Sequence, residues 1–378
     1  MTSKKKYPLL PFSQYIYDMV RWFPFAYRFT RTLRWKGGAK EEKKVREAIG
    51  KMQLAHPIFR THIDWRGRQC EDLKMNTLHS RFFKLDIFTK GDDLYLRGKI
   101  NIILADGMSI AILFNDFLQV YEGEELDLDN YWEYVARYEQ QKTGSHYCIS
   151  HNWLINEFAD NSVPVRPTID RRYLTSLLPP KVGLYKTDYS ELRAKIQQLS
   201  ETKILPIDGV FSLCTALAIA EYCGTDEAAL TWANEGRELK DQHICGCLHR
   251  DIPFHVRKSI IENRESAIRE ARNQIRSGIA HSDYPYTLTP PYNKRWNYAV
   301  NVLRVPDEES LMEKIPFPIE ILPSPPQKYA YALLDVEIHE HPQNLSLWFR
   351  YSATHYKESS IRRFASLVRK YVEWLLEE

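Results

Sequence analysis

Residues 100–109 read Ile-Asn-Ile-Ile-Leu-Ala-Asp-Gly-Met-Ser, and this stretch decides the fold class. Apolar residues before and within it share one parity, which predicts a strand with one apolar face: Leu94, Leu96, Ile100, Ile102 and Leu104. The turn dipeptide Asp106-Gly107 should end the strand, and Ser109 should cap the helix that follows. In that helix the apolar residues fall at helical spacing: Ile110, Leu113, Phe114, Phe117 and Tyr121. A strand, a tight turn and an amphipathic helix in succession predict an α/β fold.

The length and composition predict two lobes. A chain of 378 residues is too long for one ordinary hydrophobic core, and 44% hydrophobic residues are enough to build two. Residues 164–180 carry four prolines and few periodic positions, so the boundary is expected there. We therefore predict one domain over residues 1–165 and a second over residues 166–378.

Periodicity places further elements on both sides of this boundary. An amphipathic helix is expected over 39–55, a helix all of whose faces are apolar over 210–223, and a charged helix over 258–277 that ends at Gly278. The remaining expected elements are a helix over 190–200, strands over 228–233, 298–304, 331–338 and 345–351, and a closing helix that carries Ile361, Phe364, Val368, Tyr371 and Leu375.

Charge and cysteine content exclude several classes. The 52 basic residues are spread among 49 acidic ones for a net charge of +3, so nucleic acid is not an expected partner. No stretch is long and apolar enough to span a bilayer, so no membrane partner is expected, and polar residues interrupt the N-terminal segment before it reaches signal-peptide length. The six cysteines show no framework spacing, which favours reduced thiols and a cytoplasmic location.

The 100–109 stretch resembles the core motif of the condensation domains of non-ribosomal peptide synthetases. These belong with the chloramphenicol-acetyltransferase-like, coenzyme-A-dependent acyltransferases. In that family two histidines precede three spacer residues and Asp-Gly. Here the Asp-Gly pair is Asp106 and Gly107, while the histidine positions hold Asn101 and Ile102.

Other segments extend the resemblance over almost the whole chain, in the order of the family's motifs. They are Ser13-Gln14, His56 to Thr61, Glu133 to Ala136, Gly209 to Arg237, Gly246 with Ile252-Pro253, and His281 to Tyr286. The resemblance implies an α/β fold of two chloramphenicol-acetyltransferase-like lobes, each an α+β two-layer sandwich. It also implies that the lobes form a V-shaped pseudodimer with a central cleft and Asp106 at its floor.

The missing histidine bears on chemistry. Forming an amide or ester from a thioester needs a base at the attacking group, which supplies roughly 10²- to 10⁴-fold in rate. Ile102 supplies none, and its parity predicts that it packs on the apolar face of the strand. Asn101 could donate a hydrogen bond to an oxyanion but is no base near neutral pH. The candidate substitutes for the missing histidine are Asn101, as a donor to an oxyanion, and His281, as a base.

The resemblance also assigns structural roles. In the family the Asp of the core motif pairs with the Arg of a Leu-Arg-Thr motif, which corresponds here to Arg60. We therefore expect a buried ion pair between Arg60 and Asp106, with Gly107 as the turn position that needs a small residue.

Alternating residues 243, 245, 247 and 249, His-x-Cys-x-Cys-x-His, suggest a metal site. In an extended strand the outer two would lie about 20 Å apart, because a strand advances ~6.6–6.8 Å per two residues. That exceeds the reach of one ion, so only an adjacent pair could bind. We expect no metal.

Two functions stay open. The first is a condensation-domain-like protein that lacks the usual chemistry and binds an acyl- or peptidyl-carrier protein or another enzyme. The second is an active acyltransferase with a substitute base. No tightly bound cofactor is expected in either case, and the phosphopantetheine of a carrier protein or coenzyme A would be a substrate moiety. Because the chain contains no carrier or adenylating module, we expect it to act in trans, and we predict no particular oligomeric state.

Overall fold

The computed structural model describes residues 6–22, 28–71, 82–158, 160, 162–171, 180–286, 299–305, 307, 310, 313, 315, 317–324, 330 and 332–377. Parts of three predicted features lie outside these residues, namely 172–179 of the proline-rich boundary, residue 298 and residue 331.

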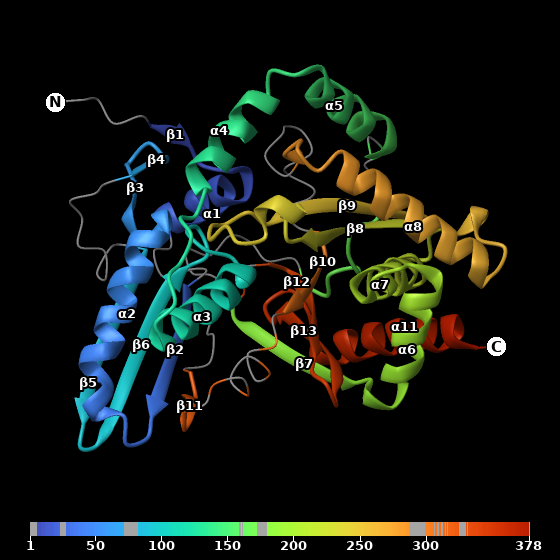
Figure 1. Ribbon diagram of the computed structural model, residues 1–378. Coiled ribbons are helices and arrows are strands. Elements are labelled where there is room, and N and C mark those ends of the chain that lie inside the picture. Colours follow the sequence, from blue (N-terminus) through green and yellow to red (C-terminus); the bar gives the residue numbers. More distant parts are fainter. Residues whose placement is uncertain are drawn as a thin grey trace. The chain divides into compact units, whose positions relative to one another are not determined.

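The chain divides into two compact units, each made of three segments (Figure 1). Unit 1 comprises Met1–Lys142, Glu235–His249 and Pro306–Pro326. Unit 2 comprises Thr143–Asn234, Arg250–Val305 and Gln327–Glu378. The lobe boundary between residues 165 and 166 stays a prediction. The structure adds that two segments from the later part of the chain pack within unit 1.

Unit 1 contains a four-stranded antiparallel sheet in the order β11-β2-β6-β5. The strands are β2 (Arg28–Trp35), β5 (Phe83–Lys90), β6 (Asp93–Asn101) and β11 (Ile319–Leu322). β11 therefore comes from the third segment of the unit and pairs with β2 across almost 300 residues of sequence. A small second sheet has the order β1-β4-β3, with strands β1 (Tyr7–Pro8), β3 (Thr61–Ile63) and β4 (Arg68–Glu71).

Two helices, α2 (Glu42–Ala55) and α3 (Gly107–Glu122), pack against each other, and α2 also packs on β5 (Figure 1). The helix predicted over 39–55 is confirmed, preceded by a short 3₁₀ turn, Ala39–Glu41. Its buried residues Val45, Ile49 and Met52 share a core with Leu94 and Ile100 of β6. Unit 1 also contains the helices α1 (Pro11–Trp22) and α4 (Tyr131–Gln141), with 3₁₀ turns at Pro57–Arg60 and Leu239–Asp241.

The end of β6 corrects two expectations. The strand stops at Asn101, and residues 102–104 form a turn closed by a hydrogen bond from Leu104 N to the carbonyl of Asn101 at 3.0 Å. The predicted placement of Ile102 on the apolar face of the strand is therefore wrong. Ser109 is also not the cap of α3, because Asp106 occupies that position and its carboxylate accepts a hydrogen bond from Ser109 N at 2.9 Å.

Unit 2 is built on a six-stranded mixed sheet in the order β7-β13-β12-β10-β8-β9. β10 runs parallel to both β8 and β12, and the other neighbouring pairs are antiparallel. The strands are β7 (Val182–Asp188), β8 (Glu227–Asn234), β9 (Arg250–Arg257), β10 (Asn301–Val305), β12 (Leu334–Glu340) and β13 (Leu345–Ser352).

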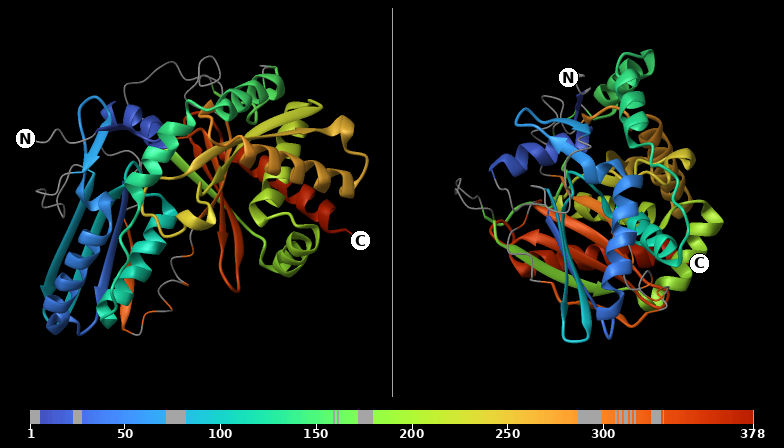
Figure 2. Two further views of the ribbon diagram at one scale, coloured as in Figure 1. Left: turned by 45° about the horizontal axis from the view of Figure 1, so that its top comes forward. Right: turned by 60° about the vertical axis from the view of Figure 1, so that its left-hand side comes forward.

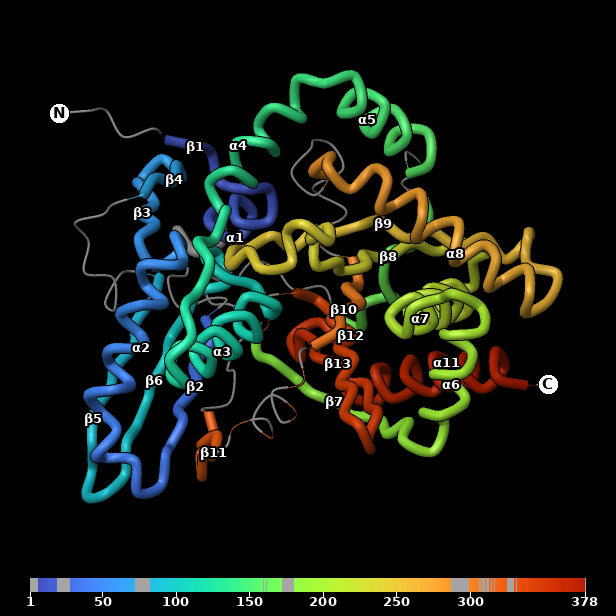
Figure 3. The backbone as a smooth tube through the Cα atoms, viewed as in Figure 1, coloured from blue at the N-terminus to red at the C-terminus, as the bar shows by residue number. Residues whose placement is uncertain are grey.

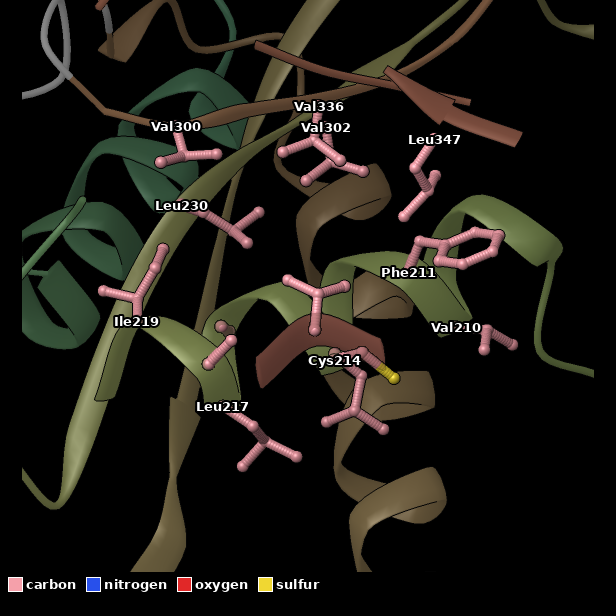
Figure 4. Packing of buried hydrophobic residues seen from close by; sticks show 14 of the residues in the cluster. Val210, Phe211, Cys214, Leu217, Ile219, Leu230, Val300, Val302, Val336 and Leu347 are labelled. Atoms are coloured by element: carbon pink, nitrogen blue, oxygen red, sulfur yellow. The ribbon is translucent and has the colours of Figure 1, made fainter. Parts of the chain in front are cut away.

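The helix α7 (Ile207–Cys223) forms the centre of the core of unit 2. Every residue from Gly209 to Ala220 is buried, as its apolar faces predict. Figure 4 shows its side chains against residues of the sheet, among them Leu230, Val302 and Val336. The helices α8 (Arg264–Ala280) and α11 (Glu358–Leu376), orange and red in Figure 2, both pack against α7. Unit 2 also contains the helices α5 (Ser145–Phe158) and α6 (Arg193–Lys203), with 3₁₀ turns at Ser190–Leu192 and Lys258–Ile260.

The charged helix of unit 2 begins and ends later than predicted. Asn263 caps it, because its side chain accepts a hydrogen bond from Ser266 N at 2.9 Å and the Ser266 hydroxyl accepts one from Asn263 N at 3.0 Å. At the other end the helix runs through Gly278 to Ala280. A Cβ atom on Gly278 would lie 2.3 Å from Cγ2 of Ile252, so this glycine permits close packing on β9 rather than ending the helix.

Among the described residues, no single helix combines the length and hydrophobicity needed to cross a membrane. The helical segments Ser190–Lys203 and Ile207–Cys223, bent by 103° where they meet, reach that length and hydrophobicity only when taken together.

Candidate functional site

The turn after β6 holds the two positions where the resemblance places histidines. Asn101 is fully buried, and its Oδ1 accepts a hydrogen bond from Ile103 N at 3.1 Å, which shapes the turn. Ile102 is half-buried at the start of the turn. The carbonyl of Ile103 accepts a hydrogen bond from the buried Ser13 hydroxyl of α1 at 3.1 Å, so α1 holds the turn in place. Neither Asn101 nor Ile102 carries a group that takes up a proton near neutral pH.

The buried Asp106 side chain accepts several hydrogen bonds. Its carboxylate accepts hydrogen bonds from Ser109 N and from Leu248 N, at 2.9 and 3.0 Å. It also forms a bidentate ion pair with Arg237, with Nη1 2.8 Å from Oδ2 and Nη2 3.0 Å from Oδ1. These donors occupy both carboxylate oxygens, so few lone pairs remain to act on a substrate. Asp106 therefore serves as a structural residue.

Arg237 extends this scaffold. Its guanidinium also donates to the carbonyl oxygens of Glu235, Ile244 and Gly246, at 3.1, 3.1 and 3.2 Å. Burial alone would lower its pKa, but the carboxylate of Asp106 more than offsets this and the pKa of Arg237 is raised. The guanidinium therefore stays charged and joins the turn before α3 to residues 235–246.

Residues 244–248, called the 244–248 segment below, lie beside the start of α3, and their course is drawn in yellow in Figure 3. Side chains of unit 1 hold this segment. Three of its backbone N–H groups donate to such side chains: Cys245 N to Asp129 at 2.8 Å, Gly246 N to Ser109 Oγ at 3.0 Å, and Leu248 N to Asp106 at 3.0 Å. The approach is close, since a Cβ atom on Gly246 would lie 2.6 Å from Cε2 of Tyr131. Only glycine fits there without displacing the ring.

The predicted ion pair between Arg60 and Asp106 is wrong. Arg60 pairs with Glu71 of β4, with Nη2 2.8 Å from Oε1, and its Nη1 donates to the carbonyls of Gln53 and Leu54 at the end of α2. Arg60 follows α2 by five residues, so its side chain reaches the unsatisfied carbonyls of that helix end. Asp106 has its own arginine in Arg237. Gly107 is the first residue of α3.

A second buried cluster surrounds His56, which directly follows α2. Its Nδ1 lies 3.0 Å from Oδ2 of Asp129, and its Nε2 lies 2.8 Å from Oδ2 of Asp116 without the alignment of a hydrogen bond. Burial alone would lower its pKa, but the two carboxylates raise the pKa of His56 to about 11. Burial raises the pKa of the neighbouring Cys245 thiol to about 11, against the opposing effect of His56. His56 belongs to one of the segments that carry the resemblance, but its partners come from distant segments and carry no local signal.

His281, the other candidate base, belongs to unit 2. Its Nδ1 lies 3.2 Å from the hydroxyl of the buried Ser150, which also donates to Asp283 at 2.9 Å. The ring stacks on Trp153 and on His146, with centroids 4.7 and 5.9 Å apart. Burial and, to a lesser extent, His146 lower the pKa of His281, so the imidazole is neutral at pH 7.

The four residues of the His-x-Cys-x-Cys-x-His pattern do not share a face of a strand. Residues 243–249 form a turn and an irregular segment. His243 is exposed, and His249 contacts Phe12 with centroids 4.3 Å apart. Cys245 lies with His56 and Asp129 instead.

The family model described as "Condensation domain" matches residues 74–378. The chain belongs to the condensation-domain family. A plipastatin synthase subunit of Bacillus subtilis (strain 168) is 22% identical to it over 284 residues, which is 72% of this chain and 8% of that protein. This condensation-domain chain therefore spans a small part of its curated relative.

Solved structures confirm the α/β fold with chloramphenicol-acetyltransferase-like lobes. The epimerization domain from the third module of tyrocidine synthetase B has a TM-score of 0.73 at 15% identity, covering 99% of this chain and 96% of that one. The X-domain from teicoplanin biosynthesis has a TM-score of 0.75 at 14% identity, covering 100% and 95%. The starter condensation domain of rhizomide synthetase, in complex with C8-CoA, has a TM-score of 0.72 at 14% identity, covering 99% and 95%.

Proposed function

We propose that this condensation-domain chain serves non-ribosomal peptide or acyl-conjugate biosynthesis without the usual histidine-dependent condensation chemistry. On this proposal it acts in trans by binding an acyl- or peptidyl-carrier protein or a partner enzyme. The structural site residues in this proposal are Asp106 and Gly107, with Arg237 rather than Arg60 as the partner of Asp106, and no catalytic residue lies at Asn101 or Ile102.

The observation that carries the proposal is the pairing of an intact scaffold with a missing base. Asp106 keeps its bonds to Arg237, Ser109 and the 244–248 segment. Two residues at the start of the same turn, Asn101 and Ile102, carry no group that takes up a proton near neutral pH. Loss of a general base alone removes roughly 10²- to 10⁴-fold in rate.

The proposed partner rests on what similar solved structures bind. One similar structure is a complex of the X-domain and OxyB from teicoplanin biosynthesis, and another holds C8-CoA. A thioester of phosphopantetheine or coenzyme A is therefore the moiety we propose to be bound rather than turned over. All six cysteines are free, which supports the proposed cytoplasmic location.

A second function, an active acyltransferase with a substitute base, is favoured by one observation. His281 has a lowered pKa and is neutral at pH 7, as a general base must be. However, its Nδ1 faces the Ser150 hydroxyl and its ring stacks on two other aromatic rings, which is typical of a structural histidine.

Thioester release separates the two functions. Wild type, Ile102→Ala, Asn101→Ala and His281→Ala are incubated with octanoyl-CoA and with acyl-loaded carrier proteins, each with amine and alcohol acceptors, and the free thiol is measured. We expect release at background in all four proteins. Carrier binding, measured by calorimetry, should persist in Ile102→Ala.

Turnover well above background that persists in Ile102→Ala and disappears in His281→Ala or Asn101→Ala would instead establish a re-equipped enzyme. Absence of both turnover and carrier binding across the panel would remove the carrier-binding proposal and leave the partner enzyme as the ligand to test.

A further inference from the structure

Three side chains of metal-ligating types, far apart in the sequence of unit 1, meet at the end of α2. His56 follows α2, Asp129 lies two residues before α4, and Cys245 lies in the 244–248 segment. Their ligand atoms all lie within 4.8 Å of one another, and all three residues are buried. We propose that His56, Asp129 and Cys245 bind one zinc-class divalent cation.

The spacing of the three ligand atoms is close to that of a tetrahedral site. Zinc bonds of about 2.0–2.3 Å to nitrogen, oxygen and sulfur place neighbouring ligands roughly 3.3–3.6 Å apart. In the structure His56 Nδ1 and Asp129 Oδ2 are 3.0 Å apart, and no pair of ligand atoms in the set exceeds 4.8 Å. Adjustment of the side chains alone is then required to bring all three atoms to bonding distance from one ion.

Two of the ligands are already oriented by the backbone. Asp129 Oδ1 accepts a hydrogen bond from Tyr131 N at 2.9 Å, and Oδ2 accepts one from Cys245 N at 2.8 Å. The carboxylate therefore fixes the position of Cys245, and the site does not depend on ordering a loop at the moment of binding.

The surroundings of His56 resemble the outer shell of known metal sites. A metal-bound histidine usually donates its second ring N–H to a carboxylate, which fixes the tautomer and the ring orientation. With Nδ1 toward Asp129, the second nitrogen is Nε2, and Asp116 Oδ2 lies 2.8 Å from it. In the described part of the chain Nε2 has no aligned hydrogen-bond partner. A small rotation of the ring would direct Nε2–H at Asp116 while Nδ1 stays near Asp129.

The donor set selects the ion. A thiolate and an imidazole suit zinc and its neighbours among the transition metals, whereas magnesium and calcium prefer oxygen ligands alone. Binding displaces one proton from His56 and one from Cys245, so the cluster with Asp116 and Asp129 keeps the same total charge. The side chain of Asp116 is 20% exposed, which leaves a route for a water as fourth ligand.

Cobalt is the probe for the experiment, because a cobalt–thiolate bond absorbs in the near ultraviolet. The full chain is stripped with a chelator and titrated with Co²⁺, and the same protein is titrated with Zn²⁺ against a chromophoric chelator. We expect one equivalent of each metal and a thiolate charge-transfer band with cobalt. Cys245→Ser should lose the band and bind at least 100-fold more weakly.

Cys247→Ser is the matched control, since this buried cysteine lies two residues away and outside the ligand set. It should keep the band and the stoichiometry. Circular dichroism checks the fold of each variant. If Cys245→Ser does not fold, alkylation of wild type replaces it: Zn²⁺ should slow labelling of Cys245 and leave the exposed Cys148 unchanged. Lack of uptake by wild type, a band that survives Cys245→Ser, or labelling of Cys245 unaffected by Zn²⁺ each overturns the proposal.

Discussion

Arg237 and Asp106 form a bidentate ion pair in unit 1, and their side chains are only 1% and 6% exposed. Replacing Arg237 by Met leaves Asp106 as a buried charge without a cationic partner. We expect Arg237→Met to lower the free energy of unfolding by about 3–5 kcal/mol. Urea unfolding followed by circular dichroism measures it.

Arg362→Met is the control for this prediction. Arg362 also pairs with a carboxylate, that of Glu358, at 2.6 Å, but the two side chains are 61% and 55% exposed. Solvent screens such a pair, so we expect a much smaller loss. Equal losses in the two variants would mean that burial of the Arg237 pair is not what makes it stabilising.

Ile102 and Ile100 differ in burial although the sequence places them at the same parity. Ile100 belongs to the core of unit 1, whereas Ile102 is half-buried on the turn. We expect Ile100→Ala to cost about 2–5 kcal/mol and Ile102→Ala about 1 kcal/mol. Thermal and urea unfolding compare them directly, and a larger loss for Ile102 would restore its predicted role as a core residue.

Gly246→Ala should destabilise unit 1. The added Cβ would lie 2.6 Å from Cε2 of Tyr131 and 2.7 Å from Cδ1 of Leu248, so the 244–248 segment or the ring must move. We expect a loss of about 1–3 kcal/mol in urea unfolding. Gly50→Ala in α2 is the matched control, since no atom lies within 4 Å of its Cβ position and alanine favours a helix by roughly 0.5–1 kcal/mol. A neutral Gly246→Ala would show that the segment is loosely packed.

Asp335 of β12 makes stability depend on pH. Burial raises its pKa to about 7, although Asn301 donates a hydrogen bond to it at 2.8 Å. Because the folded-state pKa lies above the unfolded value of about 3.9, the stabilising contribution is complete below pH ~4 and is lost as the pH rises to about 7. Asp335→Asn should therefore be more stable than wild type at pH 8, by about 1–2 kcal/mol for a half-buried group, and similar to it at pH 4.

The unfolding free energy of wild type and Asp335→Asn measured from pH 4 to 8 checks this difference. Asp188→Asn supplies a flat control over this range, because hydrogen bonds from Ser190 lower the pKa of Asp188 and its contribution is lost only as the pH falls below about 4. A constant difference between wild type and Asp335→Asn across the range would contradict the prediction.

The predicted elements that the structure confirms are those set by local periodicity. The apolar faces of α7 and the alternation of β13 depend on neighbouring residues, so the sequence suffices to place them. The periodicity misplaces the end of β6, because Asn101 bonds to Ile103 N and turns the chain before the Asp-Gly dipeptide is reached. A parity argument extended past that point fails.

The partners of the site residues could not be read locally. Arg237 is 131 residues from Asp106, and the acceptor of Cys245 N, Asp129, is 116 residues away. The resemblance assigns Arg60 to Asp106, but Glu71 is only eleven residues away and lies on the strand next to β3. Long-range pairs of this kind follow from the packed fold rather than from spacing.

Because unit 1 consists of three segments of the chain, its folding depends on how much of the chain has been translated. A ribosome makes β2, Ser109, Asp106 and Asp129 long before it makes the 244–248 segment and β11. Until then the carboxylates of Asp106 and Asp129 lack the backbone donors of that segment, and β2 has an open edge. Unit 1 therefore cannot reach its final structure during translation before residue 322 has left the ribosome, and a gene fragment that stops at residue 165 encodes only part of it.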